Sequence, residues 1–130
     1  MPAEDFPRIY DRLKKILQKY EGVLTEHQSP TFTLDKESYG LRDPHNDGSA
    51  GFFGATVIQS KYVSFYLMPV YLEPGLLKDI SPELKKRMQG KSCFNFKTYD
   101  EGLLDELDRL TEVGFAYYEA FHLVQPEPQT

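Results

Sequence analysis

The spacing of apolar residues predicts a helix near each end of the chain. Over residues 5–21, "DFPRIYDRLKKILQKYE", apolar positions recur every three or four residues, which is the period of an amphipathic helix. Asp5 is the expected N-cap of this helix, and Gly22 provides a stop signal after it. A second amphipathic run predicts a helix from Asp100, as its N-cap, to His122. The residues expected to contribute to the core from these helices are Phe6, Leu13, Leu17, Leu107, Leu110 and Phe121.

Between the two helices, alternation of apolar and polar residues predicts strands. The strongest pair is 52–60 and 62–69, which we expect to form a tight hairpin centred on residues 59–61. In the later run "SCFNFKT", Phe94 and Phe96 share one face and Cys93 shares the other with two polar residues. Short helical turns are expected at 73–80 and 81–88, and a loop at 43–51. The segments predicted as strands are 31–35, 37–42, 52–60, 62–69 and 92–98.

This order of elements predicts an α+β fold. Strands joined by short hairpins favour a twisted antiparallel sheet, here of about five strands, and two amphipathic helices can cover one face of it. The expected architecture is therefore a two-layer sandwich with the N- and C-terminal helices packed on the same face. With no repeat or linker, residues 1–130 are predicted to form a single domain, in which 122–130 is a frayed tail.

Composition narrows the class of protein. Apolar residues make up 40% of the 130 residues and charged residues 27%, which are values typical of a globular domain. A single cysteine excludes an internal disulfide and favours a reducing cytoplasm. We expect no signal peptide and no membrane contact, because no apolar stretch approaches about 18 residues. A formal net charge of −5 argues against a nucleic-acid partner.

The stretch "RMQGKSCFNFK", residues 87–97, contains the most reactive-looking residues. Gly90, Lys91 and Ser92 match the end of a phosphate-binding loop, but Lys85 stands where its first glycine is required. Cys93 has no sequence motif that would supply a catalytic base, so we expect a buried, inert thiol. The three histidines are scattered, at His27, His45 and His122, and "DPHNDG" at 43–48 lacks the acidic ligands of a calcium loop. No catalytic residue and no metal site is predicted.

Charged residues form two stripes on the predicted helices. Glu101, Asp105, Asp108 and Glu112 fall on one narrow face of the last helix, with Glu119 in line, opposite the apolar positions. The expected location of this acidic stripe is therefore the outer face. Two interpretations stay open: solvated faces joined by some inter-helix ion pairs, or surfaces for a cation or a protein partner. The basic stripe, a candidate partner surface on the first helix, consists of Arg8, Arg12, Lys15 and Lys19.

A family resemblance rests on residues 50–118. The run "KYVSFYLMPVY … LKKRMQGKSCFNFKTYDE … LLDELDRL" resembles the YdhG-like domain family, a family catalogued as a domain of unknown function. The resemblance implies a frataxin-like fold, and one bacterial member is described as an iron chaperone. Frataxin's iron sites are associated with an acidic ridge around its first helix. In this chain the acidic stripe lies on the last helix.

These observations favour a non-enzymatic function. The chain shows no convergent set of polar groups that includes a plausible base. We expect a protein-interaction or adaptor module that uses its charged helical faces, with an unidentified protein partner and no obligatory cofactor. The alternative is a frataxin-like carrier that binds iron weakly on the acidic stripe, or a small ligand in an aromatic cleft. The residues expected to line such a cleft are Tyr39, Tyr62, Tyr66 and Tyr71.

Overall fold

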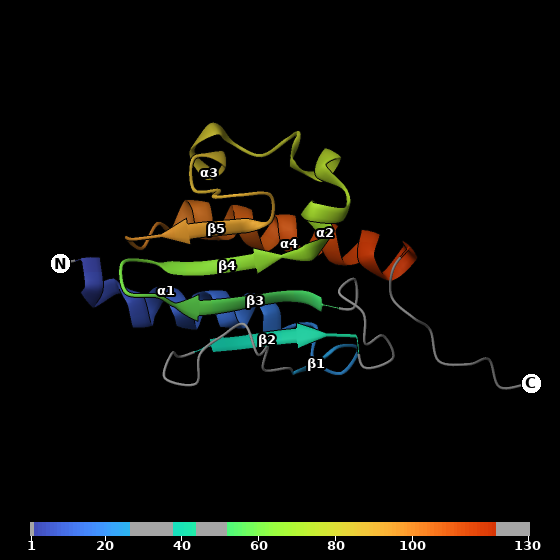
Figure 1. Cartoon of the computed structure of the whole chain (residues 1–130), viewed down its shortest axis with the longest axis horizontal. Coiled ribbons are helices and arrows are strands. Elements are labelled where there is room, and N and C mark those ends of the chain that lie inside the picture. The colour runs from blue at the N-terminus through green and yellow to red at the C-terminus, as the bar shows by residue number, and fades with distance from the viewer. Residues whose placement is uncertain (1, 27–37, 44–51, 122–130) are drawn as a thin grey trace, which may run out of the picture.

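Helices and an antiparallel sheet make up most of the computed structural model, which describes residues 2–26, 38–43 and 52–121. The chain enters through a helix, forms the sheet, makes an excursion of short helices and ends in the longest helix (Figure 1). The elements are α1 (Pro2–Gln18), β1 (Thr25–Glu26), β2 (Ser38–Arg42), β3 (Phe52–Ile58), β4 (Val63–Leu67), α2 (Met68–Leu72), the 3₁₀ helix η2 (Pro74–Leu77), α3 (Pro82–Lys85), β5 (Cys93–Phe96) and α4 (Glu101–Phe121).

The sheet is an open antiparallel meander with its strands in chain order, from β1 to β5. Its four principal strands are β2 to β5, and β1 adds a two-residue pairing beside β2. The predicted hairpin between β3 and β4 is present, and the amide of Gln59 donates to the carbonyl of Tyr62 across its turn at 2.8 Å. The strand predicted at 31–35, the centre of the loop predicted at 43–51 and the tail at 122–130 lie outside the described residues.

Strand register decides which side chains meet the helices. Phe65 of β4 lies opposite Thr56 of β3 on one side and Phe94 of β5 on the other, so these three share a face. Gly54 identifies this face as the helix-covered one, because a Cβ built there would lie 3.1 Å from Leu17 of α1. The opposite face of β4 and β5 carries Ser64, Tyr66, Cys93 and Asn95. The alternation predicted for both strands is therefore confirmed.

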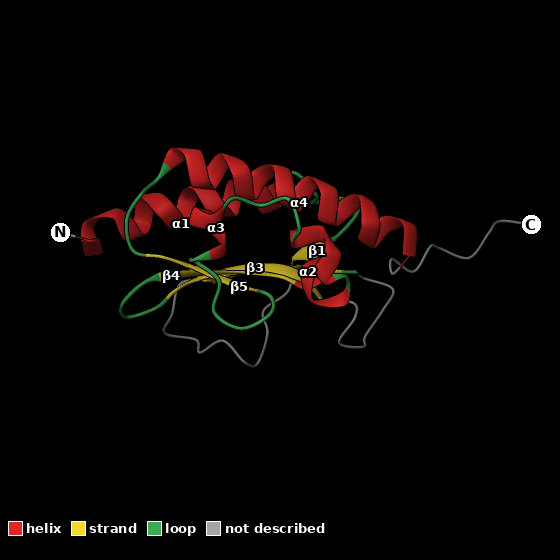
Figure 2. Cartoon of the chain, turned by 90° about the horizontal axis from the view of Figure 1, so that it is seen from above, coloured by secondary structure: helices red, strands yellow, loops and turns green. Residues whose placement is uncertain are grey.

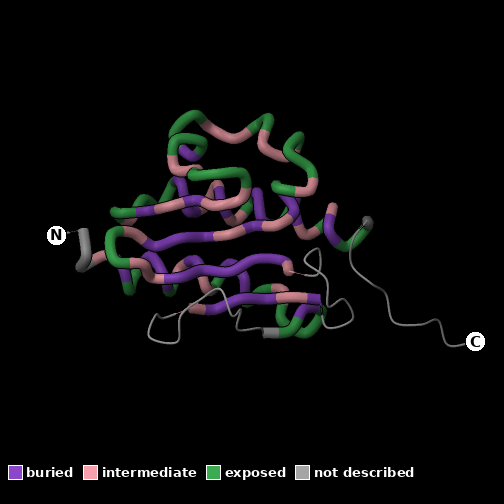
Figure 3. Tube along the Cα trace, in the orientation of Figure 1, coloured by how far each residue is buried: buried purple, intermediate pink, exposed green. Residues whose placement is uncertain are grey.

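Helices α1 and α4 lie side by side over one face of the sheet, as predicted (Figure 2). Leu13, Leu17 and Leu107 have no exposed surface, and long buried runs follow the central strands (Figure 3). Phe6 and Leu110 are also buried. The side chain of Phe121, the sixth expected core residue, lies outside the described residues.

The predicted N-cap is confirmed for α4 and is wrong for α1. Asp100 caps α4, since its carboxylate accepts from the amide of Leu103 at 3.1 Å. Asp5 is not an N-cap, because α1 begins earlier, at Pro2. The Asp5 carboxylate instead accepts from the amide of Tyr99 at 3.2 Å, which ties α1 to the loop before α4.

Two proline positions shape the excursion between β4 and β5. The strand predicted to reach residue 69 ends at Leu67, because Pro69 lacks an amide for the ladder and suits the first turn of α2. Pro82 begins α3 as predicted, after the N-cap Ser81, whose hydroxyl accepts from the amide of Leu84 at 3.1 Å.

Candidate functional site

The acidic and basic stripes meet each other along the seam between α1 and α4. Arg12 donates to the Asp105 carboxylate at 2.8 Å and lies 3.5 Å from the Asp108 carboxylate. Lys19 forms a further ion pair with Asp108. Burial opposes the charged form of Arg12, but the hydrogen bond to Asp105 and the charges of both aspartates outweigh it and raise the Arg12 pKa. Asp105 and Asp108 therefore lie at the helix–helix seam, partly exposed and joined to α1 by ion pairs of the kind that the first of the two open interpretations allows.

The other stripe residues have separate surroundings. The Arg8 guanidinium lies 3.7 Å from the centre of the Tyr99 ring, which is cation–π geometry. Lys15 pairs with Asp11 of its own helix at 3.2 Å, with both side chains mostly exposed. Glu101 and Glu112 are exposed. The acidic stripe is thus split, because its two central carboxylates already face cations of α1.

The four tyrosines predicted to line a cleft do not come together. Tyr39 lies opposite Thr56 on the helix-covered face and is 3% exposed. Tyr66 lies opposite Ala55 on the other face of the sheet. Tyr71 belongs to α2 and is 52% exposed, whereas Tyr62 stands in the β3–β4 turn. An aromatic cleft made of these four residues is excluded by the register of β2 against β3.

Cys93 belongs to a polar network on the face of β4 and β5 opposite the helix-covered one. Its thiol lies 3.4 Å from the side-chain oxygen of Asn95, which also accepts from the Ser64 hydroxyl at 2.8 Å. The Asn95 amide then donates to the side-chain oxygen of Gln89 at 2.8 Å. Burial raises the pKa of the Cys93 thiol and outweighs its hydrogen bonds with Ser64 and Tyr66. A thiol held neutral in this way is a poor nucleophile.

A surface missed at the sequence level surrounds α3 and the start of β5. Residues 78–97 contain six lysines and arginines but only two acids, in a chain whose net charge is −5. Charge counts within 20-residue windows could have revealed this local excess. Three hollows open on this part of the fold: a basic hollow, an apolar hollow and a hollow beside α4.

The basic hollow has a volume of about 330 Å³ and lies between the end of α3, the β3–β4 turn and β5. The segment after α3 runs along the edge of β5, where the backbone N–H of Asn95 donates to the backbone carbonyl of Arg87 at 2.8 Å. The Nε of Arg87 is buried and has no hydrogen-bond partner among the described residues. The polar side chains that line the basic hollow are Tyr62, Lys86, Arg87, Gln89, Asn95 and Lys97.

The apolar hollow is the largest of the three, at about 660 Å³. Its walls come from α2, η2, α3 and the turn after α3, and include Tyr71, Leu72, Leu77 and Met88. Only two charged side chains line it, and both are lysines: Lys85 and Lys91. Its size lies within the roughly 300–1,000 Å³ that is usual for small-ligand sites.

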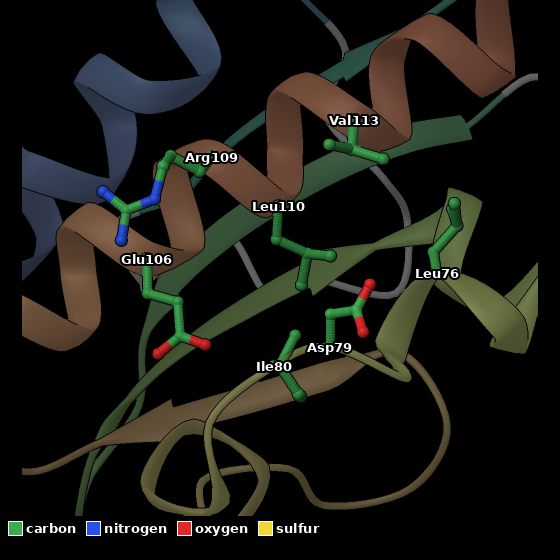
Figure 4. A pocket seen from close by; sticks show the side chains of 7 residues that line it. All are labelled: Leu76, Asp79, Ile80, Glu106, Arg109, Leu110 and Val113. Atoms are coloured by element: carbon green, nitrogen blue, oxygen red, sulfur yellow. The ribbon is translucent and has the colours of Figure 1, made fainter.

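The third hollow, of about 210 Å³, holds two carboxylates beside α4 (Figure 4). Glu106 accepts from both the amide and the hydroxyl of Ser81 at 2.6 Å, so this carboxylate is engaged in joining α3 to α4. Figure 4 shows the Arg109 guanidinium pointing away from the Asp79 carboxylate. The residues that line it are Leu76, Asp79, Ile80, Glu106, Arg109, Leu110 and Val113.

The described residues contain neither a cluster of metal ligands nor a helix able to span a membrane. Within residues 2–26, 38–43 and 52–121, no group of three or more histidine, cysteine or carboxylate side chains could hold a metal ion. No helix in the same ranges combines the length and the apolar character that crossing a bilayer requires. The three histidines lie outside the described residues.

The chain has no detectable similarity to known proteins. No family model, no curated protein and no solved structure matches the chain. The basic hollow and the apolar hollow around α3 are therefore the features from which a function can be argued.

Proposed function

We propose that this protein is a non-enzymatic interaction module that binds an acidic segment of a protein partner in the basic hollow. The observation that carries the proposal is the contrast between two sets of cations. Lys86, Arg87 and Lys97 gather around one hollow without an ion pair among the described residues. Arg12 and Lys19, two members of the basic stripe, are already paired with aspartates.

Carboxylates fit the donors of the basic hollow. The buried Nε of Arg87 has no acceptor in the described part of the chain, and a buried donor without a partner costs about 1–3 kcal/mol. A ligand carboxylate can accept from the ammonium groups of Lys86 and Lys97 and from the guanidinium of Arg87, which line the hollow. Lys86 and Lys97 are exposed at the rim, where charge steers an acidic partner and adds modest affinity. The Asn95 and Gln89 amides, joined at 2.8 Å, give the hollow a fixed polar wall.

An acidic protein segment is favoured over nucleic acid because of the charge of the whole chain. The net charge of −5 repels a polyanion as long as a nucleic acid, whereas a short peptide meets only the local basic surface. A cytoplasmic location is part of this proposal, supported by the single cysteine.

The test uses the side-chain amides of Asn95 and Gln89 as local NMR reporters. Titration with an oligo-glutamate peptide should shift both signals in the intact chain, and the shifts should weaken as salt is raised. Replacing both Lys86 and Lys97 by glutamine should weaken the affinity for the peptide roughly five- to tenfold. A double variant that replaces Lys14 and Lys15 of α1 with glutamine removes the same charge at positions that do not line the hollow, and it should bind as the parent does.

Two outcomes contradict this function. In the first, oligo-glutamate leaves both amide signals in place at about 1 mM, which would mean that the hollow has no useful affinity. In the second, a short single-stranded oligonucleotide binds more tightly than the peptide at equal charge and equal salt. That result would replace the protein partner with a nucleic acid.

The fold-family proposal stays alongside this function. A YdhG-like, frataxin-like assignment is supported by the element order and by the packing of both long helices on one face of an antiparallel sheet. Iron carriage draws less support from the geometry, since Asp105 and Asp108 face Arg12 and Lys19. To test for an iron site, ferrous iron is titrated into the parent and into a variant with Asp105, Asp108 and Glu112 replaced by amides. Equal iron binding by the two proteins would reject an iron site on this helix.

A further inference from the structure

We infer that the apolar hollow is a separate binding site for a small amphipathic carboxylate, a molecule with an apolar chain and one anionic end. This inference goes beyond the proposed interaction with an acidic segment and does not depend on it. The two hollows share only Met88 in their linings.

The shape and lining of the hollow define the apolar part of the ligand. At about 660 Å³ it is three times the volume of the hollow beside α4 and twice that of the basic hollow. Leu72, Leu77 and Met88 line it, and Tyr71 stays 52% exposed beside them. A hydrocarbon chain bound in the hollow would cover part of the exposed Tyr71 ring. Removing this apolar surface from water favours binding.

The charges of the hollow define the other end of the ligand. Lys85 ends α3 and Lys91 follows the turn at Gly90, so one lysine comes from each side of that turn. No acidic residue lines the hollow, and neither lysine forms an ion pair with another described residue. A ligand without an anion would leave this charge complementarity unused, whereas a carboxylate can accept from lysine ammonium groups.

The turn that carries Lys91 is held in place by backbone geometry. Gly90 has φ +84, a left-handed conformation that side chains disfavour, and a Cβ there would meet nothing within 4 Å. The glycine is therefore required by the turn and not by lack of space. On either side of it, Met88 bridges to Phe94 and the Gln89 amide donates to the Cys93 carbonyl at 2.8 Å. The Lys91 side of the hollow thus rests on the sheet, which favours a preformed site.

The experiment follows the methyl group of Met88 by NMR during titration with decanoate. Met68 does not line the hollow and serves as the internal reference in the same spectrum. Decanoate should shift Met88 with an affinity of about 1 mM or tighter. Replacing both Lys85 and Lys91 by glutamine should weaken the affinity for decanoate roughly tenfold. The affinity for decanol, which is weaker, should stay unchanged.

Matched variants separate this site from its neighbour. Replacing Lys86 and Lys97 with glutamine removes the same charge from the basic hollow and should leave decanoate binding at the parent level. Leu72→Trp fills the apolar hollow without changing its charge and should weaken decanoate and decanol alike. All of these variants should give the amide spectrum of a folded chain, because the four lysines are exposed and Leu72 is only half-buried.

Three results would overturn the inference. Met88 could stay unmoved by decanoate at about 1 mM, or decanol could bind as tightly as decanoate. The chain could also bind anionic phosphatidylglycerol vesicles while ignoring free decanoate, which would identify a lipid surface as the ligand in place of a single carboxylate. Since oligo-glutamate is scored on Asn95 and Gln89, failure here is distinguishable from failure of the proposed interaction.

Discussion

Arg12 of α1 donates to the Asp105 carboxylate of α4 at 2.8 Å and so joins helices that are 93 residues apart in the chain. A double-mutant cycle with Arg12→Gln and Asp105→Asn should give a coupling energy of about 0.5–1 kcal/mol, measured from urea unfolding. We expect a value this small because the Asp105 side chain is 46% exposed, so water screens the pair.

The fully exposed pair on α1 serves as the control for this cycle. Lys15 and Asp11 lie 3.2 Å apart with 66% and 65% of their side chains exposed, and their coupling should be close to zero. About 1 M salt should reduce the coupling of Arg12 with Asp105. Equal coupling for the two pairs would mean that partial burial at the seam adds nothing to the ion pair of Arg12 with Asp105.

Core packing is tested at Leu107 of α4, which has no exposed surface and belongs to the hydrophobic core. Leu107→Ala should lower the free energy of unfolding by about 2–5 kcal/mol, because it removes buried methyl groups and leaves a cavity. Val113, on the same helix and 53% exposed, is the matched position. Val113→Ala should change the stability by less than about 0.5 kcal/mol. A small effect at Leu107 would mean that α4 does not pack against the sheet as described.

Helical and strand periodicity made the two layers predictable, but exact faces required the tertiary structure. The alternation in "SCFNFKT" placed Phe94 and Phe96 in the core correctly, because a strand with one buried face has only two choices. Along α4 the expected core residues Leu107 and Leu110 are buried, but the prediction did not include three further buried residues, Leu104, Thr111 and Tyr118. Packing against both the sheet and α1 widens the buried stripe beyond a single row.

The candidate sites were less predictable than the fold for a physical reason. Whether two charged stripes face water or each other depends on the rotation of α1 and α4 about their axes, which local sequence does not determine. The tyrosine cleft failed because the face occupied by Tyr39 follows from the pairing of β2 with β3, where the register shifts at Leu41 and Arg42. Hollows such as the apolar one combine four elements and have no local sequence signature.

Gly54 tests how closely β3 approaches its neighbours. A Cβ at this position would lie 2.8 Å from the backbone oxygen of Tyr66 and 3.1 Å from Leu17. Gly54→Ala should therefore lower the free energy of unfolding by about 1–3 kcal/mol, since backbone cannot move aside as a flexible side chain can. Gly102, in the first turn of α4, has nothing closer than 3.5 Å. Gly102→Ala should stabilise by about 0.5–1 kcal/mol in the same thermal or urea unfolding experiment.

Cys93 should behave as a structural residue. Because burial raises the pKa of its thiol, alkylation of the folded chain by iodoacetamide at neutral pH should be slower than that of the urea-unfolded chain. The rate should rise as the pH passes above the usual thiol range. Cys93→Ser should retain the fold and any oligo-glutamate binding. Alkylation of the native thiol as fast as the unfolded one would show that the thiol is accessible and reactive.

Tyr20 offers a test in which a substitution should stabilise the protein. Its ring stacks on Phe115 with centroids 4.5 Å apart, but its buried hydroxyl has no hydrogen-bond partner in the described ranges. Tyr20→Phe keeps the ring and removes the unsatisfied group, so the free energy of unfolding should rise by up to about 1 kcal/mol. Tyr20→Ala, which also removes the stacking, should lower it. A destabilising Tyr20→Phe would mean that the hydroxyl has an acceptor in solution.

The same hydroxyl predicts how stability falls at alkaline pH. Burial, with the charges of Glu112 and Asp108, raises the pKa of Tyr20 to about 12 from a usual value of 10.0. Between these values the unfolded chain loses a proton that the folded chain keeps, so stability is full below the lower pKa and decreases as the pH rises toward the upper one. Burial also raises the pKa of Tyr118, so Tyr20→Phe should flatten this loss without abolishing it. Urea unfolding at a series of pH values from neutral upward measures both slopes, and identical slopes for parent and variant would show that Tyr20 titrates normally in the folded protein.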